Sequence, residues 1–118
     1  MTRNELLEYV RNQYGTEPDF PWMDDDVSIV LRHIHNRKWY GLLIKIPKSK
    51  FGLDSDEIID VINLKTKQTA SSETDTKMGI YPAWHMNKKY WISVILNNEK
   101  LTKEQICKLI DESYELTK

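Results

Sequence analysis

Two helix-start signals, one near each end of the chain, constrain the fold more than any other feature of the sequence. Glu5 follows Thr2 at a distance of three residues. Gln105 follows Thr102 at the same distance. In this arrangement, the capping box, each side chain of a pair accepts a hydrogen bond from the backbone N–H of the other residue. The pairs predict one helix that begins after Thr2 and ends at Gly15, and a second that begins after Thr102.

The middle of the chain predicts β-strands. Residues 27–46 are rich in β-branched and other apolar residues on both sides of the short connection "NRK", which is typical of a hairpin. Residues 58–64 and 90–96 have a similar composition and predict two further strands.

The segments between these strands are expected to be less regular. Residues 65–79 are polar and could hold a short helix. Residues 80–89 are expected to form a loop, because Pro82 disfavours regular structure. The order helix, hairpin, strand, short helix, strand, helix predicts a single α+β domain over residues 1–118. Its two layers are a mostly antiparallel sheet and the N- and C-terminal helices that flank it.

Alternation along two of the strands divides their side chains between two faces. In the second hairpin strand, one face carries Tyr40, Leu42, Ile44 and Ile46, and the other carries Trp39, Gly41, Leu43 and Lys45. In residues 90–96, one face carries Tyr90, Ile92, Val94 and Leu96, and the other carries Trp91, Ser93 and Ile95. If the faces with Tyr40 and Tyr90 lie against the helices, Trp39 and Trp91 lie together on the open face. If instead the opposite faces lie against the helices, Trp39 and Trp91 are covered and the aromatic surface is lost. Periodicity is compatible with both arrangements.

Composition excludes several classes of protein. There is one cysteine, Cys107, which rules out an intrachain disulfide and a cysteine-based zinc site and makes a reducing cytoplasm the expected location. The amphipathic first ten residues do not have the pattern of a secretory signal, and no apolar run is long enough to span a membrane. No glycine-rich phosphate loop, nucleophile elbow or Cys–His spacing is present, so an enzyme is not expected.

Charge is distributed unevenly although the net charge is only −1, which argues against strong nonspecific binding of nucleic acid. Residues 27–53 hold six cationic side chains and no acid, and residues 76–98 hold three lysines and no acid. If these two stretches meet in space, they form a basic face on a nearly neutral protein.

The segment "WHMNKKYW", residues 84–91, is the main candidate for a binding surface. Lys88 and Lys89 could neutralise phosphates, Asn87 could hydrogen-bond a phosphate or a base edge, and Trp84 or Trp91 could stack on a base. The tip of the hairpin would make a second contact. The candidate nucleic-acid-binding residues are Arg37, Lys38, Trp39, Lys45, His85, Asn87, Lys88, Lys89 and Trp91. The alternative is structural: Asn87 caps a turn, Trp91 packs beneath a helix and the lysines are solvated.

Two sets of residues could supply ligands to a metal ion. Asp24 and Asp26 could converge on a hard cation from one side of an extended loop. His33 and His35 lie two apart on a predicted strand and would face the same way, with His85 or an aspartate completing a zinc site. Neither set has the spacing of a defined coordination geometry, so no metal or other cofactor is expected.

Four segments of the chain resemble the MmcQ/YjbR family of small bacterial proteins. These are "FPW", "KWYGLLIKI", "YPAWHMNKKYWISVIL" and "LIDESYELT", and the resemblance covers residues 6–116. Ala83 and Trp84 stand where the family pattern has glycine and tyrosine, so the approach to His85 is expected to be packed differently. The resemblance implies an α/β fold like that of bacterial frataxin, also compared with double-wing DNA-binding domains, and it implies DNA binding.

Two functions therefore remain open from the sequence. The chain could be a non-enzymatic DNA-binding module that contacts phosphates through a basic and aromatic face. It could instead use the same face to bind a protein partner or a second copy of itself. The salt dependence of binding separates the two, because phosphate contacts weaken steeply as salt rises.

Overall fold

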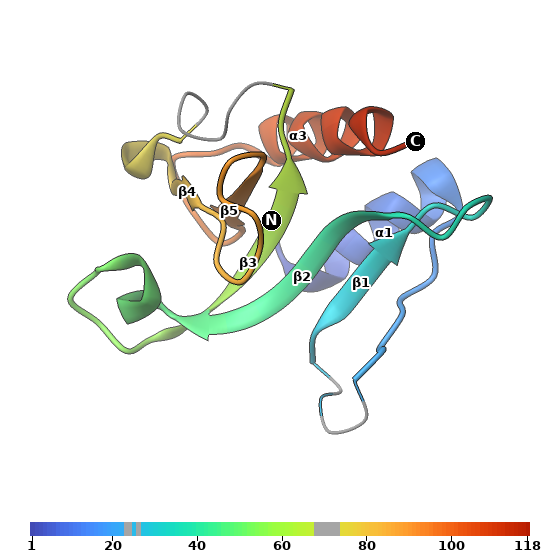
Figure 1. Cartoon of the computed structure of the whole chain (residues 1–118). Helices are drawn as coiled ribbons and strands as arrows, with labels where there is room; N and C mark the ends of the chain where they lie inside the picture. Colours follow the sequence, from blue (N-terminus) through green and yellow to red (C-terminus); the bar gives the residue numbers. More distant parts are fainter. Residues whose placement is uncertain (23–24, 26, 68–73) are drawn as a thin grey trace.

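Five strands form one antiparallel sheet in the order β1-β2-β3-β5-β4 (Figure 1). The computed structural model describes residues 1–22, 25, 27–67 and 74–118. The strands are β1 (Ile29–Arg32), β2 (Trp39–Pro47), β3 (Ile58–Lys65), β4 (Ile80–Pro82) and β5 (Trp91–Ile95). Two 3₁₀ turns, η1 (Lys48–Phe51) and η2 (Thr76–Met78), lie between them. The predicted strands at 58–64 and 90–96 correspond to β3 and β5.

Helices α1 (Arg3–Tyr14) and α3 (Lys103–Leu116) pack on one face of this sheet (Figure 1). Both predicted capping boxes are present, with the Glu5 N–H donating to the Thr2 hydroxyl at 3.1 Å and the Thr2 N–H donating to the Glu5 carboxylate at 2.8 Å. Gly15 ends α1 with a left-handed φ of 71°. The α+β fold expected from the sequence is confirmed. No helix in the described part of the chain combines the length and the apolar character that crossing a membrane requires.

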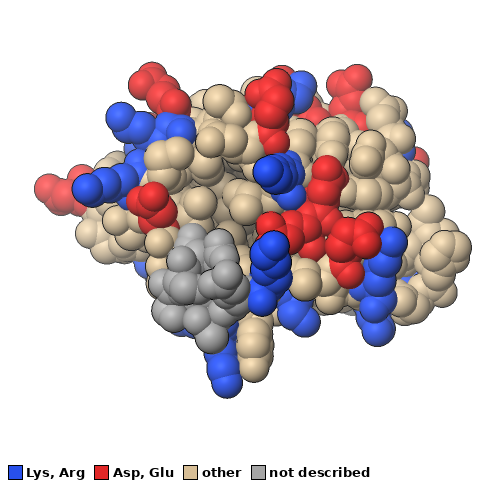
Figure 2. Space-filling model, turned by 90° about the horizontal axis from the view of Figure 1, so that it is seen from above, with Lys and Arg blue, Asp and Glu red and all other residues tan. Residues whose placement is uncertain are grey.

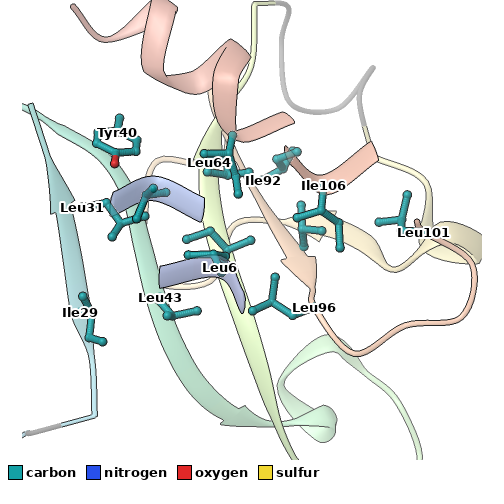
Figure 3. Close-up of a cluster of buried hydrophobic side chains, with 14 of the residues drawn as sticks. Leu6, Ile29, Leu31, Tyr40, Leu43, Leu64, Ile92, Leu96, Leu101 and Ile106 are labelled. Atoms are coloured by element: carbon teal, nitrogen blue, oxygen red, sulfur yellow. The ribbon is translucent and has the colours of Figure 1, made fainter. Parts of the chain in front are cut away.

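The main hydrophobic core lies between the helices and the sheet. Leu6 of α1 and Ile106 of α3 lie in one cluster with apolar side chains of the strands (Figure 3). Fully buried partners from the sheet include Leu31, Leu43, Ile62, Leu64 and Ile92. Because burying one such side chain stabilises the fold by about 1.5–3 kcal/mol, this layer provides most of the force that holds the helices to the sheet.

A β-bulge at Tyr40 overturns the predicted alternation along β2. Leu31 pairs with Gly41 but Arg32 pairs with Trp39, so Tyr40 is an extra residue in its strand. Tyr40 therefore turns to the helix side, where it is fully buried and its hydroxyl lies 2.5 Å from that of Thr16. The expectation that Tyr40 shares a face with Leu42, Ile44 and Ile46 is wrong. Those three residues lie on the other face, and Trp39 packs with them.

Residues 80–82, expected to form part of a loop, are strand β4. Ile80, Tyr81 and Pro82 pair with β5 at the edge of the sheet. Proline is tolerated on an edge strand because its missing N–H leaves no ladder hydrogen bond broken. The tyrosine ring stacks on Phe51 with centroids 4.6 Å apart. In the polar stretch 65–79, η2 is the helical turn that the structure describes, and residues 68–73 lie outside the described residues.

Candidate ligand-binding face of the sheet

The sheet face opposite α1 and α3 carries a second apolar cluster. Its buried members are Val30, Leu42, Ile44, Ile46, Ile59, Val61, Tyr81 and Ile95. Four partly buried side chains pack over this cluster: Trp39, Phe51, Trp84 and Met86. Large aromatic side chains on a sheet face that is only partly covered are typical of a binding surface.

All four tryptophans of the chain line one cavity of about 910 Å³ on this face. Trp39 and Trp91 come from β2 and β5, whereas Trp22 precedes β1 and Trp84 belongs to the connection between β4 and β5. Side chains of the second apolar cluster, including Leu42, form the floor. The Trp22 ring meets the Trp39 ring edge-on, with centroids 6.0 Å apart. Such a cavity can take a flat, largely apolar group of the size of a drug molecule or a base.

A buried hydrogen-bond network positions one wall of this cavity. Asn63 of β3 and Ser93 of β5 are register partners, and both are fully buried. The Ser93 hydroxyl donates to the Asn63 side-chain oxygen at 2.5 Å and accepts from the Trp84 N–H at 3.0 Å. The Asn63 amide nitrogen donates to the Trp84 carbonyl at 2.9 Å. Both backbone groups of Trp84 are thus held by the sheet beneath them, which fixes the start of the turn that follows.

That turn, residues 84–90, carries the predicted motif. His85 has a φ of 63°, in the left-handed region, and its ring packs against the Trp84 ring with centroids 3.6 Å apart. The Asn87 side-chain oxygen accepts from the Lys89 N–H at 2.9 Å, and the Asn87 carbonyl accepts from the Trp91 N–H at 3.0 Å. Asn87 therefore caps the turn, as the structural alternative had it, although it also lines the cavity.

A smaller depression of about 240 Å³ shares Trp39 and Trp91 with the cavity, and lysines ring it. Its lining residues are Lys38, Trp39, Lys65, Trp91, Leu116, Thr117 and Lys118. Lys65 and Lys118 are not among the site residues predicted from the sequence. Lys65 is brought to Trp91 by the pairing of β3 with β5, and Lys118 by the docking of α3. The clue in the sequence was that Lys65 follows Asn63 by two residues and so shares its face.

The other predicted cations are placed less favourably. The hairpin arginines share one carboxylate, since Asp19 lies 2.6 Å from Arg32 and 3.7 Å from Arg37. Lys45 reaches the edge of the cavity, but its ammonium group pairs with Asp60 at 2.8 Å. Lys88 and Lys89 are exposed in the turn before β5, and neither lines the two hollows. Of the predicted cations, Lys38 is the one that lies directly beside the tryptophans without a carboxylate partner among the described residues.

The histidine pair considered as zinc ligands does not form. β1 ends at Arg32, so His33 and His35 lie in the hairpin loop and not on a strand. The His33 ring is buried and lies 2.8 Å from the Thr117 hydroxyl, whereas His35 is exposed. Burial, followed by the charges of Lys118 and Lys38, lowers the pKa of His33. Within the described ranges no three His, Cys, Asp or Glu side chains cluster as metal ligands, and Asp24 and Asp26 lie outside those ranges.

Comparison with known proteins gives consistent matches. The YjbR family model matches residues 11–116. YyaQ of Bacillus subtilis (strain 168), named an uncharacterized protein, is 40% identical over 119 residues, which cover all of this chain and 99% of YyaQ. The crystal structure of a Pseudomonas syringae protein has a TM-score of 0.92 at 43% identity, with all of both chains covered. A Deinococcus radiodurans protein, 23% identical, shares the fold with a TM-score of 0.69 over 98% of this chain and 77% of its own. The chain belongs to the YjbR family.

Proposed function

We propose that this protein is a binding module for single-stranded nucleic acid and has no catalytic activity of its own. The observation that carries the proposal is that Trp39 and Trp91 each line both the tryptophan-walled cavity and the lysine-ringed depression. Stacking of a base on an aromatic side chain is worth about 1–3 kcal/mol, and lysines beside the stacking rings neutralise the phosphates. Both kinds of contact would come from residues that surround the same two rings, Trp39 and Trp91.

A single strand suits this surface better than a duplex. A cavity walled by indole rings can receive a base only if the face of that base is free, and in a duplex both faces are stacked on neighbours. Electrostatics also favour a ligand of few phosphates. The net charge is −1, and in the view of Figure 2 basic and acidic side chains are interspersed over the face that is seen. We therefore expect affinity to come chiefly from stacking.

A short fluorescent oligonucleotide, single-stranded or annealed to its complement, tests the proposal by anisotropy. At about 50 mM salt the single strand should bind more tightly than the duplex, with a log–log salt slope of about −2 for three phosphate contacts. Replacing Trp22, which is 42% exposed and lines the cavity, should weaken binding about tenfold in Trp22→Ala. Tyr90→Ala is the matched control, because Tyr90 is 41% exposed and lies outside the lining.

Absence of any binding by the single strand at low salt would overturn the proposal. Equal losses in Trp22→Ala and Tyr90→Ala would also count against it, because the cavity would then have no special role.

The second candidate is self-association or protein binding through the same face. Trp22 is exposed beside an apolar cavity, and indole rings in that position are frequent anchors of protein interfaces. This candidate predicts a mass that rises with protein concentration in sedimentation, with little effect of salt. A mass that stays monomeric over the whole concentration range contradicts self-association.

A further inference from the structure

We infer that the cavity and the lysine-ringed depression are the two halves of one nucleotide site, with the base held between the tryptophans and its phosphate among Lys38, Lys65 and Lys118. The inference rests on the proposed function and names its smallest ligand. The unit recognised would be a single nucleotide carrying its phosphate, and one such unit of a strand would occupy the site.

The first support is the position of each lysine beside a tryptophan. Lys65 is the register partner of Trp91 across β3 and β5, and directly opposed residues of paired strands point to the same face. Lys38 immediately precedes Trp39 in the chain. Both lysines line the depression together with Trp39 and Trp91, the two residues that also line the cavity. A nucleotide has two matching parts, a flat base and a phosphate, which are joined by one sugar.

The second support is that the wall around the lysines is rigidly built. Ser113 of α3 is fully buried; its hydroxyl accepts from the Lys65 N–H at 2.9 Å and donates to the Tyr40 carbonyl at 2.6 Å. The Thr117 hydroxyl donates to the Ser113 carbonyl at 2.8 Å and lies 2.8 Å from a ring nitrogen of His33. The last turn of α3 is therefore attached to β2, β3 and the hairpin loop. This attachment holds Lys118 at the depression.

The third support is a difference in charge between the two halves. Asp25 lines the cavity, and its side-chain oxygen accepts from the N–H groups of Val27 and Ser28 at 2.8 and 2.9 Å. These hydrogen bonds, those of Ser28 first, lower the pKa of Asp25, so it is charged at neutral pH. Lys45 also lines the cavity, but its ammonium group is paired with Asp60 at 2.8 Å. A phosphate is therefore attracted to the lysines of the depression, whereas the amino and ring N–H groups of a base are compatible with the Asp25 carboxylate in the cavity. The charges orient a nucleotide in one direction across Trp39 and Trp91.

One competing contact is weak. The ammonium group of Lys118 lies 3.1 Å from Glu115, one turn earlier on α3, and both side chains are largely exposed. Exposed pairs of this kind contribute little to stability and are screened by salt. Neither Lys38 nor Lys65 has a carboxylate partner among residues 1–22, 25, 27–67 and 74–118, so two of the three cations are available without breaking an ion pair.

Titration of the intrinsic tryptophan fluorescence with adenosine monophosphate, adenosine and inorganic phosphate tests the inference. The monophosphate should bind about tenfold more tightly than the nucleoside, because it adds charged hydrogen bonds to lysine. Lys65→Gln should remove most of this advantage and leave the affinity for adenosine unchanged. Lys38→Gln should act in the same direction. Lys108→Gln, at an exposed position of α3 outside both linings, is the matched control.

The outcomes separate the inference from the proposed function. If the oligonucleotide binds but the monophosphate does not, or if Lys65→Gln behaves like Lys108→Gln, the two-part site is wrong while the binding module stands. Equal affinities for adenosine and its monophosphate have the same meaning. If neither the oligonucleotide nor the monophosphate binds, the inference and the proposed function both fall.

Discussion

At the scale of single residues, the polar pair Asn63 and Ser93 decides the shape of the site. Two polar side chains with no exposed surface lie beside the apolar cluster of this face of the sheet. Burial of a polar group is costly unless it is hydrogen-bonded, and here the partners are each other and both backbone groups of Trp84. The pair therefore stabilises one conformation of the turn that carries His85.

We expect Ser93→Ala to lower the free energy of unfolding by about 1–3 kcal/mol, because the Trp84 N–H and the Asn63 oxygen each lose their partner in a buried position. Urea denaturation followed by circular dichroism measures the change. Ser49→Ala, at an exposed position, should stay within about 0.5 kcal/mol of the original chain. A loss in Ser93→Ala no larger than that of this control would show that the network does not stabilise the fold.

At the scale of elements, the hairpin of β1 and β2 contains both a residue with an unusual backbone conformation and a residue of the candidate site. Its loop returns through Arg37, whose φ of 62° is unusual for a residue with a side chain, and the bulge at Tyr40 follows. The bulge turns Tyr40 into the helix layer and keeps Trp39 on the open face. One extra residue in β2 thus decides which of these two neighbouring aromatic side chains enters the core and which lines the cavity.

We expect Arg37→Gly to be more stable than Arg37→Ala by about 1 kcal/mol, because glycine alone adopts a left-handed φ without a steric cost. Both substitutions remove the exposed guanidinium group and its 3.7 Å contact with Asp19, so that loss cancels in the comparison. Thermal denaturation of the two variants gives the difference. Equal stabilities would mean that the hairpin loop relaxes and stores no strain at this position.

At the scale of the whole molecule, His33 lies where the hairpin loop meets α3. Its ring is 4.3 Å from that of Tyr114 and 5.3 Å from that of Tyr40, measured between centroids, and its nitrogen contacts Thr117. Because burial and the nearby lysines lower its pKa, the ring is neutral in the folded protein at a pH at which the unfolded chain binds a proton.

We expect stability to fall as the pH drops below about 6.5, the ordinary histidine value, toward the lowered pKa of His33. In that window the unfolded chain binds more protons than the folded one, so acid favours unfolding. Carboxylates act at lower pH: the Thr2 N–H and then Lys103 lower the pKa of Glu5 to about 2, so its contribution is lost only below its usual value.

Unfolding curves between pH 7.5 and 5 measure this slope, which should shrink in His33→Gln and persist in the control His35→Gln, at an exposed loop position. A slope of the same size in all three proteins would assign the pH dependence to other groups.

Local features of the chain were sufficient for part of this description. A capping box involves residues three apart, so both helices could be predicted from their own sequences, and the composition of residues 58–64 and 90–96 was sufficient for β3 and β5. The bulge at Tyr40 was missed although Gly41, an isolated glycine within β2, is a signal of a bulge. The position of the extra residue is set by pairing with β1 and by burial of the Tyr40 ring under the helices. Strand β4 was missed because proline is unfavourable in a central strand, and only the strand order puts it at an edge.

For the site, the chain's residue types were enough to name candidates for binding: the tryptophans, the lysines and the motif of residues 84–91. Which of these candidates lie together depends on the packed fold. The β3–β5 register carries Lys65 to Trp91, the docking of α3 brings Lys118, and pairing with Asp60 occupies Lys45. The difference lies in how far apart along the chain the interacting residues are. Backbone propensity and capping act over a few residues of the chain, whereas a cavity is made by side chains far apart in sequence, whose contacts depend on the packing of the whole sheet.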